Sequence, residues 1–470
     1  MLWKPDGWWT GVNSENRSGL VPKTFLRHLP VEELSQALRI LEKRGEGDTE
    51  NSRQKDSKAE TEETLHDSMG KAQVADESIL PRSSSTSIPP LAMVMNRPVR
   101  CLGDALRADP HLTYACHLTP RLSHSNLAFH DLYWNYEDDK LRKRHVRVSC
   151  LIRLIRFEGM PRDIHTGLIR VALYDTSQKT GKQLVSNVHT IRAQIKGSTW
   201  TFISRADTAN TGIDFSDFLL RSNYKSKEVI LLLQASVITF EEGHYVENAL
   251  GSYKLSMIGD NFESCIAKKT YTDYLTSENI FDRESTPSKT NFKIVLKALD
   301  VPKDLVQYVD ALPDVLLYNP MFIRITYFYR RRAGTLLLRD RSNPLSAEMI
   351  SDPLLSAFPF VADQPDLMDL ITGMWMSRFK QLKIKTEVNQ AQTFFHIFMN
   401  TAYCIHRTAV MPDYCMWDKK VLAERQEVLK KCVDMLREYK SAARFLLTTT
   451  SKPINIYDYS MDIMGIHALD

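Results

Sequence analysis

The feature that most constrains the fold is a series of short runs, rich in β-branched and other large apolar residues, in the middle of the 470-residue chain. Turns containing glycine, proline, serine or aspartate separate these runs, and no helical pattern intervenes. The runs are residues 145–157, 168–175, 184–195, 199–202, 229–240, 251–258 and 292–299. Parallel strands need crossovers that are usually helical. We therefore expect an antiparallel β-sandwich within residues 93–340, with a C2-like sandwich as one version of that fold.

The last part of the chain, residues 341–470, has helical spacing instead. Residues 365–375 and 390–405 each predict a helix, and residues 418–447 predict the longest one, with a single apolar face. Packing in the core explains that face better than a coiled-coil partner, because the repeat spans few heptads. The overall class is α+β.

Two stretches beside these regions are harder to assign. Residues 322–329 could form another strand or a bridge to the helices, and residues 110–126 have the composition of a loop.

The N-terminus carries a different pattern. Residues 4–11 contain two adjacent tryptophans on a short β-rich run, and a hairpin leads from there to Gly-Leu-Val-Pro and an aromatic within residues 19–25. This order resembles the second half of an SH3 domain. The resemblance implies that Trp8, Pro22 and Phe25 line a groove for proline-rich peptides. The alternative is that Trp3, Trp8 and Trp9 are structural aromatics of another N-terminal β-hairpin.

Since an SH3 domain needs about twice this length, we expect residues 1–30 to be the C-terminal half of a truncated domain, too small to fold alone. Residues 31–92 begin with a helical pattern and continue as a charged segment. Between residues 42 and 82 there are eleven acidic and seven basic side chains with almost no aliphatic ones. Such a composition predicts a disordered linker.

Composition excludes several classes of function. The net charge of +4 is small for this length and gives no electrostatic case for nucleic acid. The longest apolar run is too short to span a bilayer. The seven cysteines are scattered and never form C-x-x-C pairs, which indicates a reducing, cytoplasmic compartment and no zinc site.

Catalytic motifs and phosphate-binding glycine loops are absent from the sequence, so we expect no enzyme activity and no cofactor. Calcium binding by loop aspartates is a weaker alternative, because aspartate is a common turn residue and no D-x-D spacing occurs. The aspartates concerned are Asp163, Asp175, Asp207, Asp214 and Asp217.

One basic cluster, Lys140, Arg142, Lys143 and Arg144, has two interpretations. It could contact acidic lipid headgroups or an acidic partner. A solvated edge strand protected by basic side chains is the commoner arrangement. If these residues share an exposed loop at one end of the sandwich, the lipid interpretation is favoured.

Several longer segments carry a family resemblance. They are residues 125–134, 169–175, 185–192, 199–202, 336–341, 352–359 and 364–369. These segments resemble the C-terminal homology region of the nephrocystin-1 family, and the order of SH3-like start, charged linker and globular remainder is similar too. Phe25 stands where the family has a groove tyrosine.

The resemblance implies a non-enzymatic scaffold or adaptor. Its partners would be nephrocystin-4-like and other transition-zone proteins, with proline-rich signalling or cytoskeletal proteins added if the SH3 domain is complete. Its location would be the cytoplasm, the ciliary transition zone, cell junctions and the cytoskeleton. The competing hypothesis is a peripheral membrane module, in which a C2-like sandwich uses basic residues near 140–147.

Overall fold

The computed structural model divides into two compact units, Met1–Ile88 and Pro89–Asp470, each of which is described by itself. Side chains are described for residues 99–119, 132–162, 164–177, 183–203, 212–241, 243–282, 285–339, 352–382 and 386–452, and backbone alone for 2–3, 8–12, 18–22, 350–351 and 460–461. The predicted disordered linker lies outside these residues. The first unit contains a three-stranded antiparallel sheet of β1 (Leu2–Trp3), β2 (Trp8–Val12) and β3 (Ser18–Pro22).

The second unit is built on one large sheet whose strand pairings are antiparallel. Its strands are β6 (Val148–Glu158), β7 (Thr166–Asp175), β8 (His189–Arg192), β9 (Gln194–Lys196), β10 (Thr199–Thr201), β11 (Asp217–Ser222), β12 (Val229–Glu241), β13 (His244–Ser256), β14 (Thr270–Ser277), β15 (Ser288–Leu299) and β16 (Leu316–Tyr318). The order is β16-β11-β6-β15-β14-β13-β12-β7-β8, with β9 and β10 attached through β6. The predicted antiparallel sandwich is confirmed.

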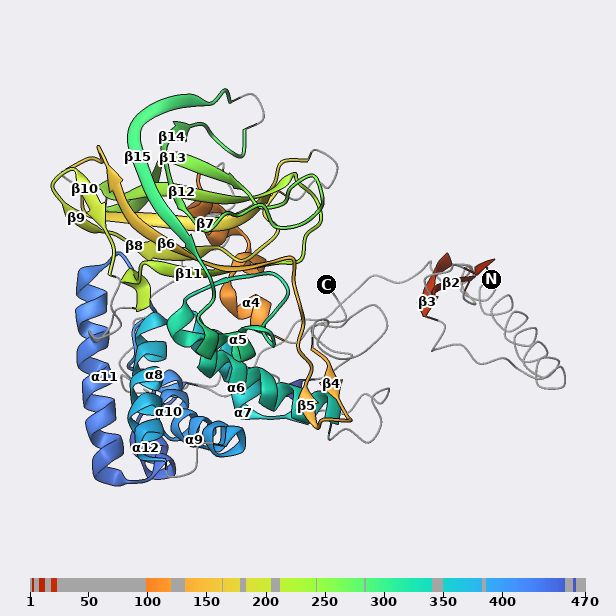
Figure 1. Cartoon of the computed structure of the whole chain (residues 1–470). Coiled ribbons are helices and arrows are strands. Elements are labelled where there is room, and N and C mark those ends of the chain that lie inside the picture. Colours follow the sequence, from red (N-terminus) through yellow and green to blue (C-terminus); the bar gives the residue numbers. More distant parts are fainter. Residues whose placement is uncertain are drawn as a thin grey trace, which may run out of the picture. The chain divides into compact units, whose positions relative to one another are not determined.

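The sheet curls until it is nearly closed, so that its inward face forms a core of its own. Strands β6, β7 and β12 contribute alternate apolar residues to it, such as Ile152, Val171 and Leu231, and Trp200 of β10 is fully buried there. This alternation is the period of two that a half-buried strand needs. The curled sheet forms the upper part of the unit in Figure 1, with most of the helices below it.

The helical elements of the second unit begin before the sheet and continue after it. They are α3 (Leu102–Ala108), η2 (Pro110–Leu112), α4 (Tyr114–Leu118), η3 (Gly212–Asp214), α5 (Lys303–Val309), η4 (Pro320–Phe322), α6 (Ile323–Gly334), η5 (Thr335–Arg339), α7 (Pro353–Ala362), α8 (Pro365–Gln381), α9 (Glu387–Asn400), α10 (Ala402–Arg407), α11 (Lys419–Tyr439) and α12 (Ala442–Thr448). Two short strand pairs, β4 (Trp134–Asn135) with β5 (Lys140–Leu141) and β17 (Ile350–Ser351) with β18 (Ser460–Met461), complete the unit.

Two expectations from the sequence were wrong. The strand alternative for residues 322–329 fails, because this run is the start of α6 and nearly every side chain from Ile323 to Arg330 is buried. A helix buried all round shows no 3.6-residue period in its apolar residues. Likewise, residues 110–118 of the expected loop form η2 and α4. Thr113 caps α4, since its hydroxyl accepts from the N–H of Cys116 at 3.3 Å.

Helices and sheet share a second core. Leu151, Leu219 and Leu316 on the outer face of the sheet pack in one cluster with buried residues of α6 to α10. The apolar face of α11 packs against the same cluster through residues such as Cys432, so the core-packing interpretation of that face is supported. Because this cluster contains residues of both the strands and the helices, the sandwich and the helices should unfold together.

Candidate functional site

The proposed SH3 groove lies in the first unit. The register of β2 and β3 places Trp8 opposite Pro22, which puts two of the three groove residues on neighbouring strands. Phe25 lies outside the described residues, as do the side chains of the other two. The groove therefore stays a prediction.

The basic cluster near residue 140 is placed on the helical side of the second unit. Hairpin β4–β5 packs against α6, where Gly334 lies close to Leu141 and Trp134. Lys140, Arg142 and Lys143 are exposed, and Arg144 is half-buried. They lie on this hairpin and its extended connection to β6, so they do not form a loop at one end of the sandwich.

Arg144 is held more firmly than its neighbours. Its guanidinium forms an ion pair with Asp314 at 2.6 Å and lies 4.8 Å from the ring centre of Tyr133. Its backbone N–H donates to the carbonyl of Asp310 at 2.7 Å. These contacts give Arg144 a structural role in fixing the connection that enters β6.

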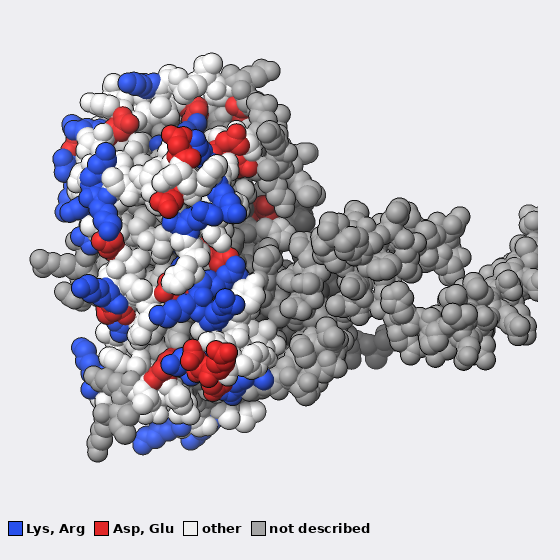
Figure 2. Space-filling model, turned by 45° about the vertical axis from the view of Figure 1, so that its right-hand side comes forward, with Lys and Arg blue, Asp and Glu red and all other residues white. Residues whose placement is uncertain are grey.

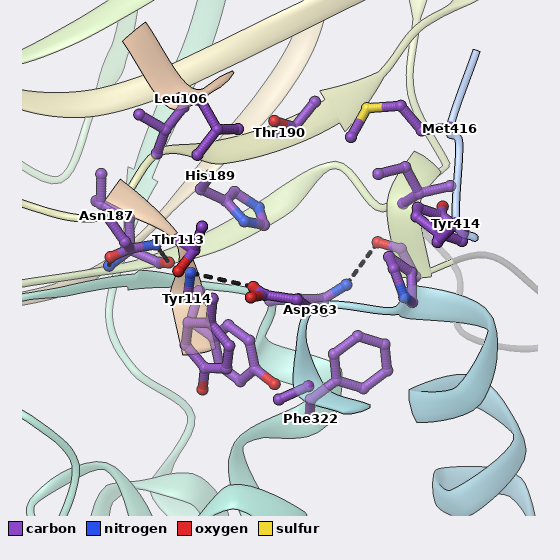
Figure 3. A pocket seen from close by; sticks show the side chains of 18 residues that line it. Leu106, Thr113, Tyr114, Asn187, His189, Thr190, Phe322, Asp363, Tyr414 and Met416 are labelled. Atoms are coloured by element: carbon purple, nitrogen blue, oxygen red, sulfur yellow. Dashed lines mark hydrogen bonds between the residues drawn. The ribbon is translucent and has the colours of Figure 1, made fainter. Parts of the chain in front are cut away.

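The described residues contain a cavity of about 260 Å³ where the two edge strands of the curled sheet approach each other, which we call the seam cavity. Strand β8 lies on one side and β16 on the other, and η3, η4 and the α7–α8 corner close the remaining sides. Figure 3 shows its lining residues, including Leu106, Thr113, Tyr114, Asn187, His189, Thr190, Phe322, Asp363, Tyr414 and Met416.

Asn187 joins the two edges of the sheet next to this cavity. Its side-chain N–H donates to the carbonyl of Leu317 at 2.7 Å, and its side-chain oxygen accepts from the N–H of Leu317 at 3.0 Å. The amide thus occupies the place of a neighbouring strand's peptide group. Because Asn187 is fully buried, its loss would leave both backbone groups of Leu317 without these partners.

Two titratable groups line the seam cavity in an apolar setting (Figure 3). Burial lowers the pKa of His189 to about 4, so the imidazole is neutral near pH 7. Burial also raises the pKa of Asp363 to about 6, although the backbone N–H groups of Tyr114 and Ala115, each 3.0 Å away, oppose that shift. Tyr114 stacks on Tyr318 with ring centres 3.7 Å apart. The cavity has the size and character to hold one apolar or aromatic side chain.

The corner between α7 and α8 connects three distant elements. Asp363, Asp366 and Asp369 follow one another at intervals of three residues. Asp363 accepts from the N-terminus of α4, Asp366 pairs with an arginine of α11, and Asp369 accepts from the N–H of Gly212 at 3.2 Å. Burial, with repulsion from Asp366 and Asp214, raises the pKa of Asp369 to about 7. Residues 364–369, one of the family-like segments, thus hold α11 and η3 in position against this corner.

The arginine of α11 is Arg425, which is almost completely buried. Its Nε donates to Asp366 at 2.8 Å, and one terminal nitrogen donates to Asp366 at 3.1 Å and to the side-chain oxygen of Gln364 at 2.8 Å. The other terminal nitrogen donates to the carbonyl of Pro412. Such a bidentate, fully used guanidinium fixes α11 against the corner.

A groove lies between α6 and α9 on the helical side, with a cavity of about 220 Å³. We call it the α9 groove. Val388, Ala391 and Phe395 of α9 line it at helical spacing, together with Phe328 and Leu354. Val388 is 51% exposed, whereas Ala391 and Phe395 are half-buried and pack against the helical core, and the buried Phe394 also lines the groove.

Two arginines of α6 border the α9 groove. Arg332 lies 5.0 Å from the ring centre of Phe395 and pairs with Asp352 at 2.9 Å, while Arg331 pairs with Glu387. Asp352 also caps α7 by accepting from two backbone N–H groups. The charged groups at the edge are therefore held in place, and Val388 is the apolar side chain of the lining that is exposed to solvent.

Within the described ranges, no group of three or more His, Cys, Asp or Glu residues could hold a metal ion. Of the five loop aspartates considered for calcium, Asp214 and Asp217 form ion pairs with Arg192 and Arg153. Asp163 and Asp207 lie outside the described residues. A search of the described helices finds none that is long and apolar enough to cross a membrane.

The comparisons with known proteins agree with the family resemblance. No family profile matches the chain. It is 39% identical over 473 residues to a nephrocystin-1-like protein of Caenorhabditis elegans, a stretch that covers 99% of this chain and 64% of that protein. It is 25% identical over 497 residues to nephrocystin-1 of Canis lupus familiaris, with 98% and 86% covered. The chain therefore spans less than two thirds of the length of the worm protein.

The fold of the second unit is a curled antiparallel sandwich that shares a core with a layer of helices. Its surface has grooves that are large enough for a side chain. Both relatives carry the nephrocystin-1 name, and the similarity to each runs over nearly the whole of this chain. The chain is nephrocystin-1-like.

A solved CC2D1B structure, from work on the mitotic reformation of the nuclear envelope, aligns with 42% of this chain and 69% of its own length at 8% identity. With a TM-score of 0.19, this alignment does not show a shared fold. The C2-like version of the sandwich remains a prediction.

Sequence reasoning missed the residues of the seam cavity. Asn187 lies in a family-like segment, yet its pairing with Leu317, 130 positions away, has no local signal. Arg425 was an unremarked residue of an amphipathic helix. The one local signal for the burial and pairing of Arg425 was its position on the apolar side of that helix.

Proposed function

We propose that the chain is a non-enzymatic scaffold that organises protein complexes at the ciliary transition zone and at cell junctions. Similarity along 99% of the chain to a nephrocystin-1-like protein carries the proposal. A groove with presented apolar side chains supports it, because unpartnered apolar surface rimmed by polar groups marks interaction sites.

The α9 groove is the docking surface in this proposal, and its occupant is the apolar face of a helix from a nephrocystin-4-like protein. Val388, Ala391 and Phe395 line one side of the groove, at a spacing that a second helix can pack against. The paired Arg332 and Arg331 at the edge would face the polar side of such a helix. The SH3-like strands would add proline-rich partners if the domain is complete.

The placement of the basic cluster favours the scaffold over a peripheral membrane module. Lys140, Arg142 and Lys143 lie on the helical side and not on a loop at the end of the sandwich. On the face drawn in Figure 2, basic groups alternate with acidic ones. Anionic lipid attracts a surface of mixed charge weakly.

The test is a pull-down from ciliated cells with the whole chain as bait and with the variant Val388→Asp. A charge at the centre of the groove should abolish capture of the nephrocystin-4-like protein while leaving the circular dichroism spectrum unchanged, because Val388 is half exposed. Val410→Asp is the matched control, since Val410 is 58% exposed and outside the groove. Equal capture by both variants would contradict docking in the α9 groove.

A further inference from the structure

The seam cavity adjoins a second cavity, of about 390 Å³, which lies between α8 and α11. We call it the α11 cavity. Ile213, Pro365 and Tyr414 line both cavities, so a bound segment can pass from one into the other. The remaining lining of the α11 cavity comes from β8, α8 and α11 and includes Asp369 and Lys419.

The imidazole of His189 is the polar group that the seam cavity offers to a ligand (Figure 3). Among the described residues, neither ring nitrogen of His189 forms a hydrogen bond, and the ring lies 5.9 Å from the ring centre of Phe218. Because the imidazole is neutral near pH 7, it has one donor and one acceptor nitrogen. By contrast, the hydroxyl of Thr190 already accepts from Arg170. An apolar cavity with one available polar group suits an aromatic ligand that forms a single hydrogen bond.

The volume of the seam cavity sets the size of that ligand. An engineered apolar cavity of about 150 Å³ holds benzene. The seam cavity, with about 260 Å³, therefore has room for a two-ring indole. The stacked rings of Tyr114 and Tyr318 and the ring of Phe322 supply flat apolar walls. A tryptophan side chain matches the cavity in size and shape, and its N–H can donate to the acceptor nitrogen of His189.

In the α11 cavity, Asp369 is a carboxylate that no cation of the described residues neutralises. Its Oδ2 accepts from the N–H of Gly212 at 3.2 Å, and its Oδ1 accepts no hydrogen bond from the described residues. Burial and repulsion from Asp366 and Asp214 raise the pKa of Asp369, and only the N–H of Gly212 opposes that rise. A cationic group bound at Oδ1 would stabilise the ionised carboxylate.

The two arginines nearest to Asp369 are already paired with other carboxylates. Arg192 pairs with Asp214 at 2.6 Å, and Arg425 pairs with Asp366 at 2.8 Å. Each of these pairs is neutral as a whole. The α11 cavity therefore keeps the negative charge of Asp369, to which a cationic ligand is complementary.

The other polar groups of the α11 cavity leave room for such a cation. Lys419 is exposed on the first turn of α11 and forms no ion pair within the described ranges, so solvent screens its charge. The hydroxyl of Tyr414 forms no hydrogen bond with the described residues. Asp369 and Tyr414 thus supply two acceptors. The planar guanidinium of arginine, with several donors in a fixed geometry, can use both.

We propose that the seam cavity and the α11 cavity together bind an extended segment of a partner protein that carries a tryptophan and an arginine. The tryptophan side chain fills the seam cavity and donates its N–H to His189, and the arginine pairs with Asp369. Two adjoining cavities of different chemistry favour a segment over a free small molecule, which would fill one of them. No residue of this site lines the α9 groove, so the site is a second docking surface of the same unit.

The seam cavity is tested with indole and 1-methylindole, which carries a methyl group in place of the N–H. Titrations of the whole chain followed by ligand-observed NMR should show that indole binds at least about fivefold tighter, as expected for one hydrogen bond. His189→Phe keeps a ring but removes the acceptor, and should bind the two compounds equally. Absence of indole binding, or equal affinity of the unmodified chain for both compounds, would overturn the proposal.

The α11 cavity is tested with fluorescein-labelled peptides in which one, two or three glycines separate a tryptophan from an arginine. Their counterparts carry glutamine in place of arginine. Fluorescence anisotropy at low ionic strength should show at least one arginine peptide binding about tenfold tighter than its counterpart. Asp369→Asn should remove this difference. Asp300→Asn is the matched control, because Asp300 is 70% exposed and lines neither cavity, and should keep the affinity within about twofold.

Circular dichroism of each variant checks that the fold is retained. Equal affinity for arginine and glutamine peptides, or a preference for arginine that persists in Asp369→Asn, would contradict the pairing with Asp369. An arginine peptide that binds no tighter than free indole would make the seam cavity a small-molecule site and overturn docking of a partner segment.

Discussion

Replacing Arg425 with methionine should destabilise the second unit far more than replacing an exposed arginine of the same helix. The Arg425 side chain is 1% exposed and Asp366 is 15% exposed, so the substitution leaves a mostly buried carboxylate without its cation. Breaking such a pair costs about 3–5 kcal/mol, because the remaining charge stays desolvated. For a unit of the size of Pro89–Asp470, that corresponds to a fall in the melting temperature on the order of 4–6 °C.

Thermal unfolding followed by circular dichroism measures this effect. Arg437→Met is the control on α11: Arg437 pairs with Asp434, but the two side chains are 77% and 58% exposed, and its loss should cost within about 0.5 kcal/mol. The double variant Arg425→Met, Asp366→Leu should recover much of the lost stability, since no lone charge remains. The reasoning is refuted if Arg425→Met melts at the temperature of Arg437→Met.

Three further predictions concern the rest of the chain. Limited trypsin digestion should cut within residues 42–90 and leave a stable fragment starting between about Arg82 and Arg107. Early cutting between β15 and α6, giving two stable pieces, would contradict the shared core. Residues 1–30 should bind proline-rich peptides poorly, because half a barrel leaves its core exposed; micromolar affinity abolished by Trp8→Ala would show a working groove. Stability should rise as pH falls from about 8 to about 5, because Asp369 and then Asp363, whose pKa values are raised to about 7 and about 6, bind more protons folded than unfolded; the slope for each group approaches about 1.4 kcal/mol per pH unit only below its folded pKa. Asp369→Asn should flatten that dependence in urea titrations, and an unchanged slope would count against it.

The sequence predicted the strands that carry long apolar runs and failed where such runs are absent. Strands β6, β7 and β12 combine β-branched or leucine-rich runs with clear limits, and each was placed within a few residues. Strand β14 reads Thr-Tyr-Thr-Asp-Tyr-Leu-Thr-Ser, and of its eight side chains only Leu275 is fully buried, so its composition resembles a loop. Strand β11 is short, and three of its six buried residues are the polar Asp217, Arg221 and Ser222, so it lacks the apolar run by which β7, also buried throughout, was found.

Helices were predictable to the extent that one face meets solvent. The single helix expected for residues 418–447 is two, because Lys440 has φ 53° and Ser441 caps α12 by accepting from the N–H of Arg444. Left-handed backbone at a lysine has no signal in the residue type, since glycine or asparagine usually takes that place.

The candidate sites could not be predicted because they are assembled from segments far apart in the sequence. The seam cavity, for example, needs Asn187, Gly212, Asp363 and Tyr414 together. Hydrophobic periodicity places residues on faces of single elements. It does not say which faces meet, and that information is carried by buried pairs such as Arg425 with Asp366.

The most direct test of the scaffold account is deletion of residues 1–90. The whole chain and the deletion variant are each used to capture the nephrocystin-4-like protein from ciliated cells, with circular dichroism confirming that the shortened chain is folded. The account places docking in the second unit, so the deletion should leave the captured amount unchanged. Loss of capture by a folded deletion variant would contradict the claim that partner binding is a property of the sandwich and its helices.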